Sequence, residues 1–295
     1  MEILIIKLNA TGDVVRTTTL LHRLQGRITW VTAKNNVSLI TGLQNNIRCI
    51  CSDSHDIAAL HDSTFDLVIN LEDEVDIARF VQGLKYQQLF GAYVDAVGQM
   101  RYTDSARAWF DLSIISAYGR RQADLLKFQN RRSYQDLLFE GLGFRFAEER
   151  YVLPKALDTD LRGDVAIAPV AGPVWPMKNW AYYEQLKLQL ESRGFAVNYL
   201  PHRATLLEHI GDIQGHRVLV GGDSLPMHLA LGVNVPCVTI FNCTSPWEIH
   251  GYGIQTQLIS PLLGEFFYKR TFDARATTAI PLDTVLAAVV NRLER

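Results

Sequence analysis

Two series of short apolar runs, each alternating with segments of helical spacing, constrain the fold of this chain most strongly. The first series predicts strands over 3–8, 27–33, 47–52 and 65–71, and the second over 165–170, 195–200, 217–222 and 235–241. Helical patterns lie between the runs, as at 14–24, 35–43 and 181–194. Strands that alternate with helices favour a parallel sheet covered by helices, and continuously apolar strands are typical of a sheet buried on both faces. The sequence therefore predicts an α/β fold built from two Rossmann-like units.

The expected boundary between the units is the polar, proline-containing segment 151–164. We expect an N-terminal domain over 1–155 and a C-terminal domain over 156–280, which fits a chain of 295 residues. The last segment, 281–295, predicts an amphipathic helix with Pro281 near its start. Whether this helix packs back on the N-terminal domain is left open.

Charge, cysteine usage and hydropathy exclude several functions. The formal net charge of −2 argues against a nucleic-acid binder that depends on phosphate attraction. No CxxC pair occurs, so buried free thiols are favoured over a metal site; the cysteines are Cys49, Cys51, Cys237 and Cys243. The N-terminus lacks the features of a signal peptide, and no apolar run approaches the ~20 residues of a membrane span. We expect a cytoplasmic protein with at most peripheral contact at the inner face of the cytoplasmic membrane.

The turn NATGD, residues 9–13, follows the first expected strand. Ligands of open parallel sheets bind beyond the carboxyl ends of the strands, which is where this turn lies. The turn has only Gly12, without the GxGxxG of a dinucleotide site or the GK[ST] of a P-loop. Asp13 is equally well explained as a cap of the following helix, with Gly12 permitting the turn, and as a site residue.

Two stretches of the second unit add candidates for an anion site. In VGGDSLPMHLA (220–230), Gly222 allows close approach of a ligand, and a short helix begins at Asp223 or Ser224 with His228 one turn further on. An ordinary capped helix, with a histidine that is hydrogen-bonded within the protein, explains the same sequence equally well. In APVAGPVWPMKNW (168–180), Lys178 stands between a loop and a helix start, where its charge favours phosphate binding over a solvated role.

Together these stretches resemble the ADP-heptose:lipopolysaccharide heptosyltransferases (glycosyltransferase family 9), which have the two-domain GT-B architecture. The opening KLNATGDVVRTT resembles the K-x-x-x-x-G-D-V start of that family, and GGDSLPMHLA resembles its D-[ST]-G-x-x-H stretch. WPMKNW resembles a K-x-W before a helix, and VPCVTIFNCTSP resembles an apolar strand followed by G-x-T-x-P. The motifs occur in the same order across nearly the whole chain.

The resemblance implies a GT-B glycosyltransferase that works without a metal or cofactor and inverts the anomeric carbon. It places a saccharide or glycolipid acceptor, such as a lipopolysaccharide core, on the N-terminal domain and a nucleotide-sugar donor, ADP-heptose, on the C-terminal domain, with reaction in the cleft. Asp13 would be the general base. The donor would lie among Lys178, Gly222, Asp223, Ser224 and His228, with Thr244 and Ser245 lining the same pocket, and Gly12 beside the base.

This sequence also departs from the family pattern. Leu225 stands where the family has glycine, and the segment between 200 and 217 is short enough to predict a trimmed helix and strand. The acidic run 71–76 is expected to supply helix N-terminal charge first, with acceptor contact as the lesser alternative. The acid-x-acid pattern at 158–160 is expected to be surface charge rather than a metal site. The basic residues Arg120, Arg121, Lys127, Arg131 and Arg132 are explained either by a solvated helix face or by acceptor contact.

Other functions remain open at this point. A non-catalytic nucleotide-sugar or saccharide-binding protein would keep the fold, but it would gain little from Asp13. A transferase with a different donor sugar or a non-lipopolysaccharide acceptor fits the same motifs. A Rossmann-type oxidoreductase is disfavoured by the missing GxGxxG.

Overall fold

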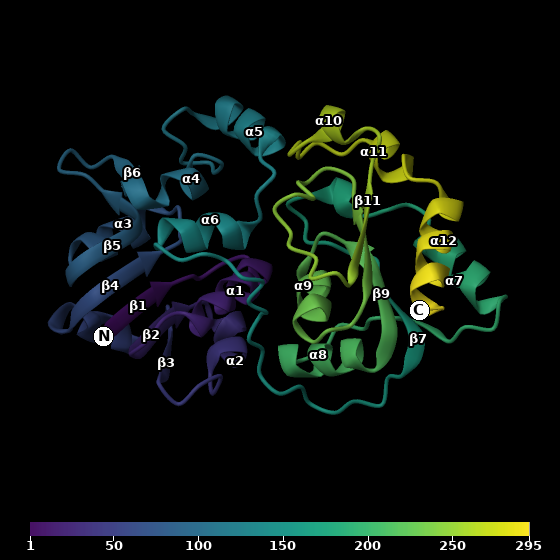
Figure 1. Ribbon diagram of the computed structural model, residues 1–295, viewed down its shortest axis with the longest axis horizontal. Helices are drawn as coiled ribbons and strands as arrows, with labels where there is room; N and C mark the ends of the chain where they lie inside the picture. The colour runs from purple at the N-terminus through teal and green to yellow at the C-terminus, as the bar shows by residue number, and fades with distance from the viewer. Residues whose placement is uncertain (295) are drawn as a thin grey trace. The chain divides into compact units, whose positions relative to one another are not determined.

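The computed structural model describes residues 1–294, and the chain divides into two compact units, Met1–Pro154 and Lys155–Arg295. Each unit is an α/β domain with its own sheet (Figure 1). The expected α/β fold with two Rossmann-like units is confirmed.

The N-terminal sheet has the strand order β3-β2-β1-β4-β5-β6. Its strands are β1 (Glu2–Ile6), β2 (Arg27–Thr32), β3 (Ile47–Cys51), β4 (Thr64–Asn70), β5 (Lys85–Val94) and β6 (Met100–Tyr102). All neighbouring pairs are parallel except β5 and β6. The chain moves from β1 outward to β3 and then returns to β4 beside β1, so the order reverses between β1 and β4. A ligand of such a sheet binds at this reversal, beyond the carboxyl ends of the two strands.

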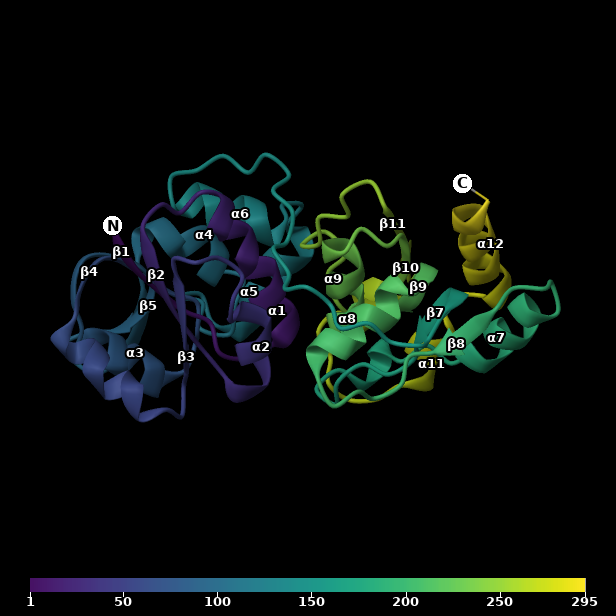
Figure 2. The same cartoon turned by 90° about the horizontal axis from the view of Figure 1, so that it is seen from below.

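Helices cover both faces of the N-terminal sheet (Figures 1 and 2). They are α1 (Thr11–Thr17), α2 (Val37–Ile40), α3 (Val75–Gln82), α4 (Arg107–Phe110), α5 (Arg120–Gln129) and α6 (Tyr134–Gly141). Val81 of α3 packs on one face with Leu4 and Ile6 of β1. Since successive residues of a strand point to opposite faces, Ile3 and Ile5, which are also buried, point to the other face.

The C-terminal sheet has the order β11-β10-β9-β7-β8, and all of its strand pairs are parallel. Its strands are β7 (Gly163–Ala168), β8 (Val197–Tyr199), β9 (His216–Gly222), β10 (Cys237–Phe241) and β11 (Gln255–Ile259). The helices of this unit are α7 (Tyr183–Glu191), α8 (Leu206–Gln214), α9 (Leu225–Gly232), α10 (Leu263–Phe266), α11 (Ala274–Thr278) and α12 (Leu282–Leu293). The order reverses between β7 and β9, which marks the corresponding ligand position of this unit.

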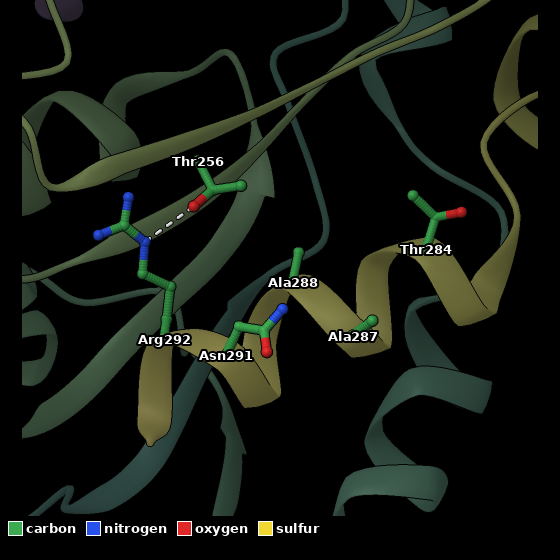
Figure 3. Close-up of a pocket in the computed structure, with 6 residues that line it drawn as sticks. All are labelled: Thr256, Thr284, Ala287, Ala288, Asn291 and Arg292. Carbon is green, nitrogen blue, oxygen red and sulfur yellow. Dashed lines mark hydrogen bonds between the residues drawn. The ribbon is translucent and has the colours of Figure 1, made fainter. Parts of the chain in front are cut away.

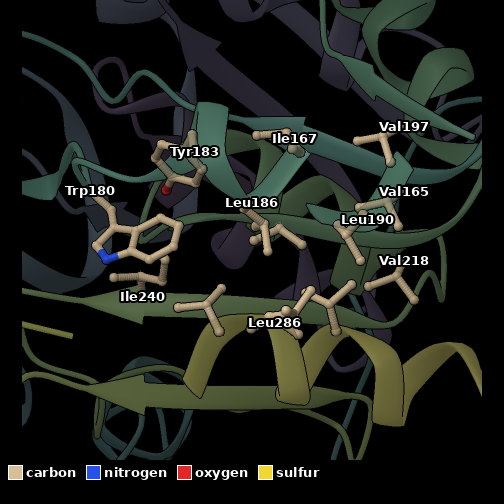
Figure 4. Packing of buried hydrophobic residues seen from close by; sticks show 14 of the residues in the cluster. Val165, Ile167, Trp180, Tyr183, Leu186, Leu190, Val197, Val218, Ile240 and Leu286 are labelled. Carbon is tan, nitrogen blue, oxygen red and sulfur yellow. The ribbon is translucent and has the colours of Figure 1, made fainter. Parts of the chain in front are cut away.

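The core of the C-terminal unit lies between the sheet and the pair α7 and α12 (Figure 4). Leu186 of α7 and Leu286 of α12 meet Val218 and Ile240 of the sheet in this core. The indole N–H of Trp180 donates to the carbonyl oxygen of Ile280 at 2.9 Å, just before α12 begins. The C-terminal helix therefore buries its apolar face in the core of its own unit.

Helix α8, which was expected to be trimmed, is present as a helix of nine residues. Thr205 and Glu208 form a capping box at the start of α8, in which the Thr205 hydroxyl accepts from the Glu208 amide and the Glu208 carboxylate accepts from the Thr205 amide. The chain from 200 to 217 therefore contains the complete connection from β8 to β9.

A hollow of about 320 Å³ lies between α12 and the edge strand β11 (Figure 3). Arg292 closes one side of it by donating from Nε to the hydroxyl of Thr256 at 2.8 Å. Thr256 pairs with Val238 near the amino end of β10, so the hollow is far from the carboxyl strand ends of the sheet. Small side chains such as Ala287 account for the open space.

Candidate active site

The turn after β1 takes its shape from Ala10. Ala10 has φ of +54°, in the left-handed region that favours glycine, and α1 begins at the next residue. Gly12 is the second residue of α1 and does not have positive φ. The expectation that Gly12 permits the turn is therefore wrong, because the helix has already begun when the chain reaches it.

Asp13 lies in the first turn of α1 but does not cap it. The N-cap position is Ala10, which has no side-chain cap hydrogen bond. The Asp13 carboxylate instead forms an ion pair with the guanidinium of Arg16. The Asp13 side chain remains 29% exposed whereas that of Arg16 is 9% exposed, so the cation is buried behind the acid. Asp13 is therefore not the N-cap residue, although its charge lies in the first turn of α1, and its side chain is partly accessible.

Arg16 is in turn held by an aromatic ring of α6. Its guanidinium carbon lies 4.3 Å from the centroid of the Tyr134 ring, a cation–π contact. The Tyr134 hydroxyl lies 2.8 Å from that of Thr17. Burial and the nearby charge of Asp13 raise the pKa of Tyr134 well above its usual range, so its phenol stays neutral. A rigid neutral ring therefore positions Arg16, and Arg16 positions Asp13.

Glu72 lies two residues after the end of β4 and accepts hydrogen bonds from the turn that follows β1. Its Oε1 accepts from Lys7 Nζ at 2.7 Å and from the amides of Leu8 and Asn9 at 2.7 and 3.3 Å. Glu72 is 3% exposed. The expectation that the acidic run 71–76 supplies charge to the following helix holds for Asp76, in the first turn of α3, but not for Glu72, because α3 begins only at Val75.

The part that Glu72 plays in shaping the β1 turn was not predicted, although the sequence carries a signal for it. Lys7 interrupts the apolar run ILIIKL, and a lysine in a buried strand run requires a buried acid. The β1–β4 reversal thus carries one buried acid that shapes the turn and one accessible acid, Asp13, above it.

The corresponding reversal of the C-terminal unit joins Lys178 and Asp223. Lys178 Nζ donates to Asp223 Oδ2 at 2.9 Å and to the Asp223 carbonyl oxygen at 2.6 Å. Both side chains are largely buried, with 14% and 8% exposure. Burial alone raises the pKa of the Asp223 carboxyl, but the Lys178 ammonium, His228 and two hydrogen bonds hold that pKa well below its usual range.

Three further predicted residues surround this pair. The Thr244 hydroxyl donates to Asp223 Oδ2 at 2.8 Å, and His228 Nε2 lies 4.0 Å from Asp223 Oδ1. Ser245 follows Thr244 after the carboxyl end of β10. Its hydroxyl is buried and has no hydrogen-bond partner within residues 1–294. A buried polar group without a partner is uncommon and points to a ligand or water at this position.

The glycine and serine of the GGDS stretch lie at the end of β9 and the start of α9. A Cβ on Gly222 would lie 2.8 Å from the carbonyl oxygen of Lys178, so Gly222 lets the Lys178 backbone approach β9 rather than a ligand. Ser224 is the N-cap residue of α9 without a side-chain cap bond. Leu225 and Pro226 follow it, and Pro226 removes one of the amides that an anion would use.

The remaining charged segments are paired on the surface. Arg120 binds Asp124 at 3.0 Å, Arg132 binds Glu140, and Asp158 binds Arg162 at 2.6 Å. Within residues 1–294 no group of three or more His, Cys, Asp or Glu side chains has a metal-holding arrangement. None of the helices described is long and apolar enough to cross a bilayer.

Comparisons with known proteins agree with this architecture. Residues 174–265, which include Lys178, Asp223 and Thr244, match the model of glycosyltransferase family 9 (heptosyltransferase). No curated protein matches the chain in sequence.

Solved structures share the fold over the whole chain. The E. coli heptosyltransferase WaaC with ADP is 15% identical with a TM-score of 0.63, covering 99% of this chain and 100% of that one. A family 9 glycosyl transferase from Veillonella parvula is 16% identical with a TM-score of 0.63, covering 99% and 97%. E. coli ADP-heptose lps heptosyltransferase II is 14% identical with a TM-score of 0.60, covering 100% and 99%.

The two α/β units and their likeness to these structures define a fold of the GT-B type. Within the C-terminal unit, residues 174–265 are similar to glycosyltransferase family 9, the heptosyltransferase family.

Proposed function

We propose that the protein transfers a heptose from ADP-heptose to a saccharide acceptor, inverts the anomeric carbon, and needs no metal ion. The observation that carries the proposal is the pair of polar clusters at the two strand-order reversals: an accessible carboxylate in one unit and a buried lysine–aspartate pair in the other. The choice of donor rests on the family and on a WaaC structure that contains ADP-2-deoxy-2-fluoro heptose.

In this proposal the C-terminal unit holds the diphosphate of the donor. An ammonium group has three donors, and Lys178 uses two of them on Asp223. The third would bind a phosphate oxygen, and Asp223 would act as a positioning residue that aims the ammonium. Thr244 orients the Asp223 carboxylate, and the buried Ser245 hydroxyl is available to the nucleotide.

Asp13 would be the general base. The acceptor hydroxyl oxygen attacks the anomeric carbon from the side opposite the diphosphate, and its proton passes to the Asp13 carboxylate. The bond from the anomeric carbon to the diphosphate oxygen breaks, and ADP leaves with the electron pair. The Lys178 ammonium and the amides at the start of α9 would stabilise the charge on the leaving group, a role that a divalent cation fills in other transferases.

The test compares wild type with Asp13→Asn, which keeps the size of the side chain and removes its basicity. With ADP-heptose and a lipopolysaccharide core acceptor, we expect a loss of roughly 10²–10⁴-fold in kcat, the usual contribution of general base catalysis. The shift of Tm produced by ADP should remain unchanged, because the base does not touch the nucleotide. Asp76→Asn, at a 90% exposed acid of α3, is the matched control and should retain full activity.

Three results would contradict the proposal. If no nucleotide sugar is consumed by wild type, the protein is a binding protein of the same fold. If EDTA abolishes turnover, the metal-free mechanism is wrong. If Asp13→Asn loses its response to ADP, Asp13 belongs to the donor site.

A further inference from the structure

The edge of the N-terminal sheet carries a hollow that the proposed transfer does not use. Strand β6 pairs only with Ala92–Val94 of β5, so the segment 85–90 of β5 has no neighbouring strand on that side within residues 1–294. Beside this open edge lies a hollow of about 370 Å³. Its lining residues, which we call the tyrosine groove, are Tyr86, Leu89, Tyr93, Tyr102, Thr103 and Asp104.

One wall of the tyrosine groove is rigid. The Tyr102 hydroxyl donates to the Asp111 carboxylate and accepts from the Ala117 amide at 2.8 Å. The Tyr102 ring stacks on Phe110 with centroids 5.4 Å apart and planes 16° apart. The ring is therefore held before any ligand arrives, which lowers the entropy lost on binding.

The other wall is a pair of half-buried tyrosines on β5. Burial raises the pKa of Tyr86, and the neighbouring Tyr93 raises it further. Tyr86 and Tyr93 both line the groove, so their phenols are close together. Each offers a flat apolar face with a polar tip, the amphipathic character that makes tyrosine frequent at binding surfaces.

We propose that the tyrosine groove binds a saccharide segment of the acceptor. A sugar ring has apolar C–H faces and hydroxyl groups around its rim, so its faces fit the tyrosine rings and its hydroxyls fit the phenols and the Asp104 carboxylate. The charged residue among the lining residues, Asp104, is an acid paired with Arg107, so the described lining offers no cation to a phosphate or nucleotide. The volume lies within the range of small-molecule sites.

The position of the tyrosine groove within the sheet links it to Asp13. Ile6 of β1, Asn70 of β4 and Gly91 of β5 lie in one row across the carboxyl edge of the sheet, and the Thr103 amide donates to the Gly91 carbonyl at 3.0 Å. With strands about 4.8 Å apart, Thr103 lies roughly 15 Å along this row from Ile6. An acceptor of several linked sugar rings would reach from the Asp13 turn to the tyrosine groove.

A continuous set of ring contacts joins the same two places. Phe110, on which Tyr102 stacks, contacts Trp109 edge-on at 4.6 Å, and Trp109 contacts Tyr134 edge-on at 5.4 Å. Tyr134 carries the Arg16 guanidinium that positions Asp13. The inference rests on the proposed function, since it assigns the tyrosine groove to a remote part of the same acceptor.

The experiment uses the full chain and measures two quantities for Tyr86→Ala and Tyr93→Ala. The first is the Kd for a dephosphorylated lipopolysaccharide core oligosaccharide, without donor, by isothermal titration calorimetry. We expect each variant to bind roughly tenfold more weakly, the size of one aromatic contact. The second is KM for the oligosaccharide acceptor, which should rise by a similar factor while KM for a single-sugar acceptor stays unchanged.

Controls separate ring contact from unfolding. Tyr93→Phe keeps the ring and should bind within about twofold of wild type. Tyr199→Ala, at a tyrosine 38% exposed on β8 of the other unit, should bind like wild type. Near-UV circular dichroism and Tm identify any variant that fails to fold. If Tyr86→Ala or Tyr93→Ala does not fold, the other variant still tests the inference.

The outcomes distinguish this inference from the proposed function. If the oligosaccharide binds wild type, Tyr86→Ala and Tyr93→Ala equally, the tyrosine groove is not a saccharide site, even when Asp13→Asn confirms transfer. If a peptide in extended conformation, and no oligosaccharide, protects β5 from hydrogen exchange, the open edge binds a strand and the inference is overturned. If Asp13→Asn leaves turnover intact but the tyrosine variants lose oligosaccharide binding, the proposed base is wrong and the tyrosine groove stands.

Discussion

At individual residues, the pairing of Lys178 with Asp223 decides how the donor site behaves. A buried ion pair contributes little net stability compared with apolar residues of the same volume, but removal of one partner leaves a buried charge alone. Because Asp223 also accepts from Thr244, its charge stays in place when the lysine is removed. The pair is therefore better explained by ligand binding than by folding.

Substitutions at the pair should separate these two roles. Lys178→Met should lower the free energy of unfolding of the C-terminal unit by about 3–5 kcal/mol, because the Asp223 carboxylate loses its cation. The double variant Lys178→Met with Asp223→Leu should recover most of that loss, yet neither variant should show a Tm shift with ADP. Urea denaturation with and without ADP measures both effects. A double variant that still responds to ADP would remove Lys178 from the donor site.

Among the elements, the side chain of Asn198 connects the beginnings of strands β7, β8 and β9 in the C-terminal sheet. Asn198 of β8 donates from Nδ2 to the Arg162 carbonyl at 2.9 Å, next to β7, and lies 3.0 Å from Nε2 of His216 at the start of β9. Nδ1 of His216 lies 2.6 Å from the Asp212 carbonyl oxygen. These contacts fit a neutral imidazole with its proton on Nδ1, accepting from Asn198 through Nε2.

Because these hydrogen bonds require a neutral His216, we expect the free energy of unfolding to fall in mild acid. Burial lowers the pKa of His216 below 6.5 and outweighs the hydrogen bond to Asp212, which raises it. The unfolded chain therefore binds the proton first, and the stability from the neutral form is lost as the pH falls from about 6.5 through the lowered pKa. The slope for one group is at most about 1.4 kcal/mol per pH unit.

Hydrogen exchange of the β9 amides between pH 7.5 and 5.5 measures the effect, after correction for the intrinsic rate. His216→Gln should show a shallower pH dependence of the opening free energy than wild type. The slope should not vanish, because burial also lowers the pKa of His209 on α8. Equal slopes in the two proteins would mean that His216 does not titrate in this range.

The sequence predicted the largely apolar strands, including the edge strands β3 and β8, and missed strands that contain many polar residues. Strands β1, β4, β9 and β10 are central, so their letters are continuously apolar and their positions followed directly. The edge strand β11 reads QTQLI and lies half-exposed, and β5 reads KYQQLFGAYV with a polar first half beside the open edge. The capping box of α8, T-x-x-E, was a usable signal for the helix that was expected to be trimmed.

The candidate site was predictable in its residue types and not in its contacts. Sequence order indicated Asp13, Lys178 and Asp223, because each follows a strand at its carboxyl end. Spacing could not show that Ala10 rather than Gly12 takes the left-handed turn, or that Asp13 pairs with Arg16. Those features depend on Tyr134 of α6, more than a hundred residues away, which no local pattern records.

At the scale of the whole molecule, each of the two units has a hydrophobic core of its own. Val165, Leu186 and Leu286 belong to a core within the C-terminal unit, and Leu4, Val68 and Val81 to one within the N-terminal unit. The donor cluster and α12 both lie on the C-terminal side of residue 155. Each unit thus has what a domain needs to fold alone.

Residues 155–295 expressed alone should fold cooperatively and bind ADP with the affinity of the full chain, within a few-fold. The fragment should catalyse no transfer, because Asp13 is absent. Near-UV circular dichroism and the ADP-dependent Tm provide the measurements, with the fragment 1–154 as the matched control that should fold without responding to ADP. A fragment 155–295 that folds but does not respond to ADP would place essential nucleotide contacts in the N-terminal unit.

The half-covered strand β5 also affects how the protein behaves in concentrated solution. An unpaired strand edge is a template for joining a second chain, and self-association through such edges leads to aggregates. Over residues 85–90 the exposed side chains are Lys85, Gln87 and Gln88, and a charge at the beginning of an edge discourages the approach of an identical edge. We therefore expect Lys85 to oppose self-association of the purified protein through this edge. A variant selected for high expression should retain Lys85.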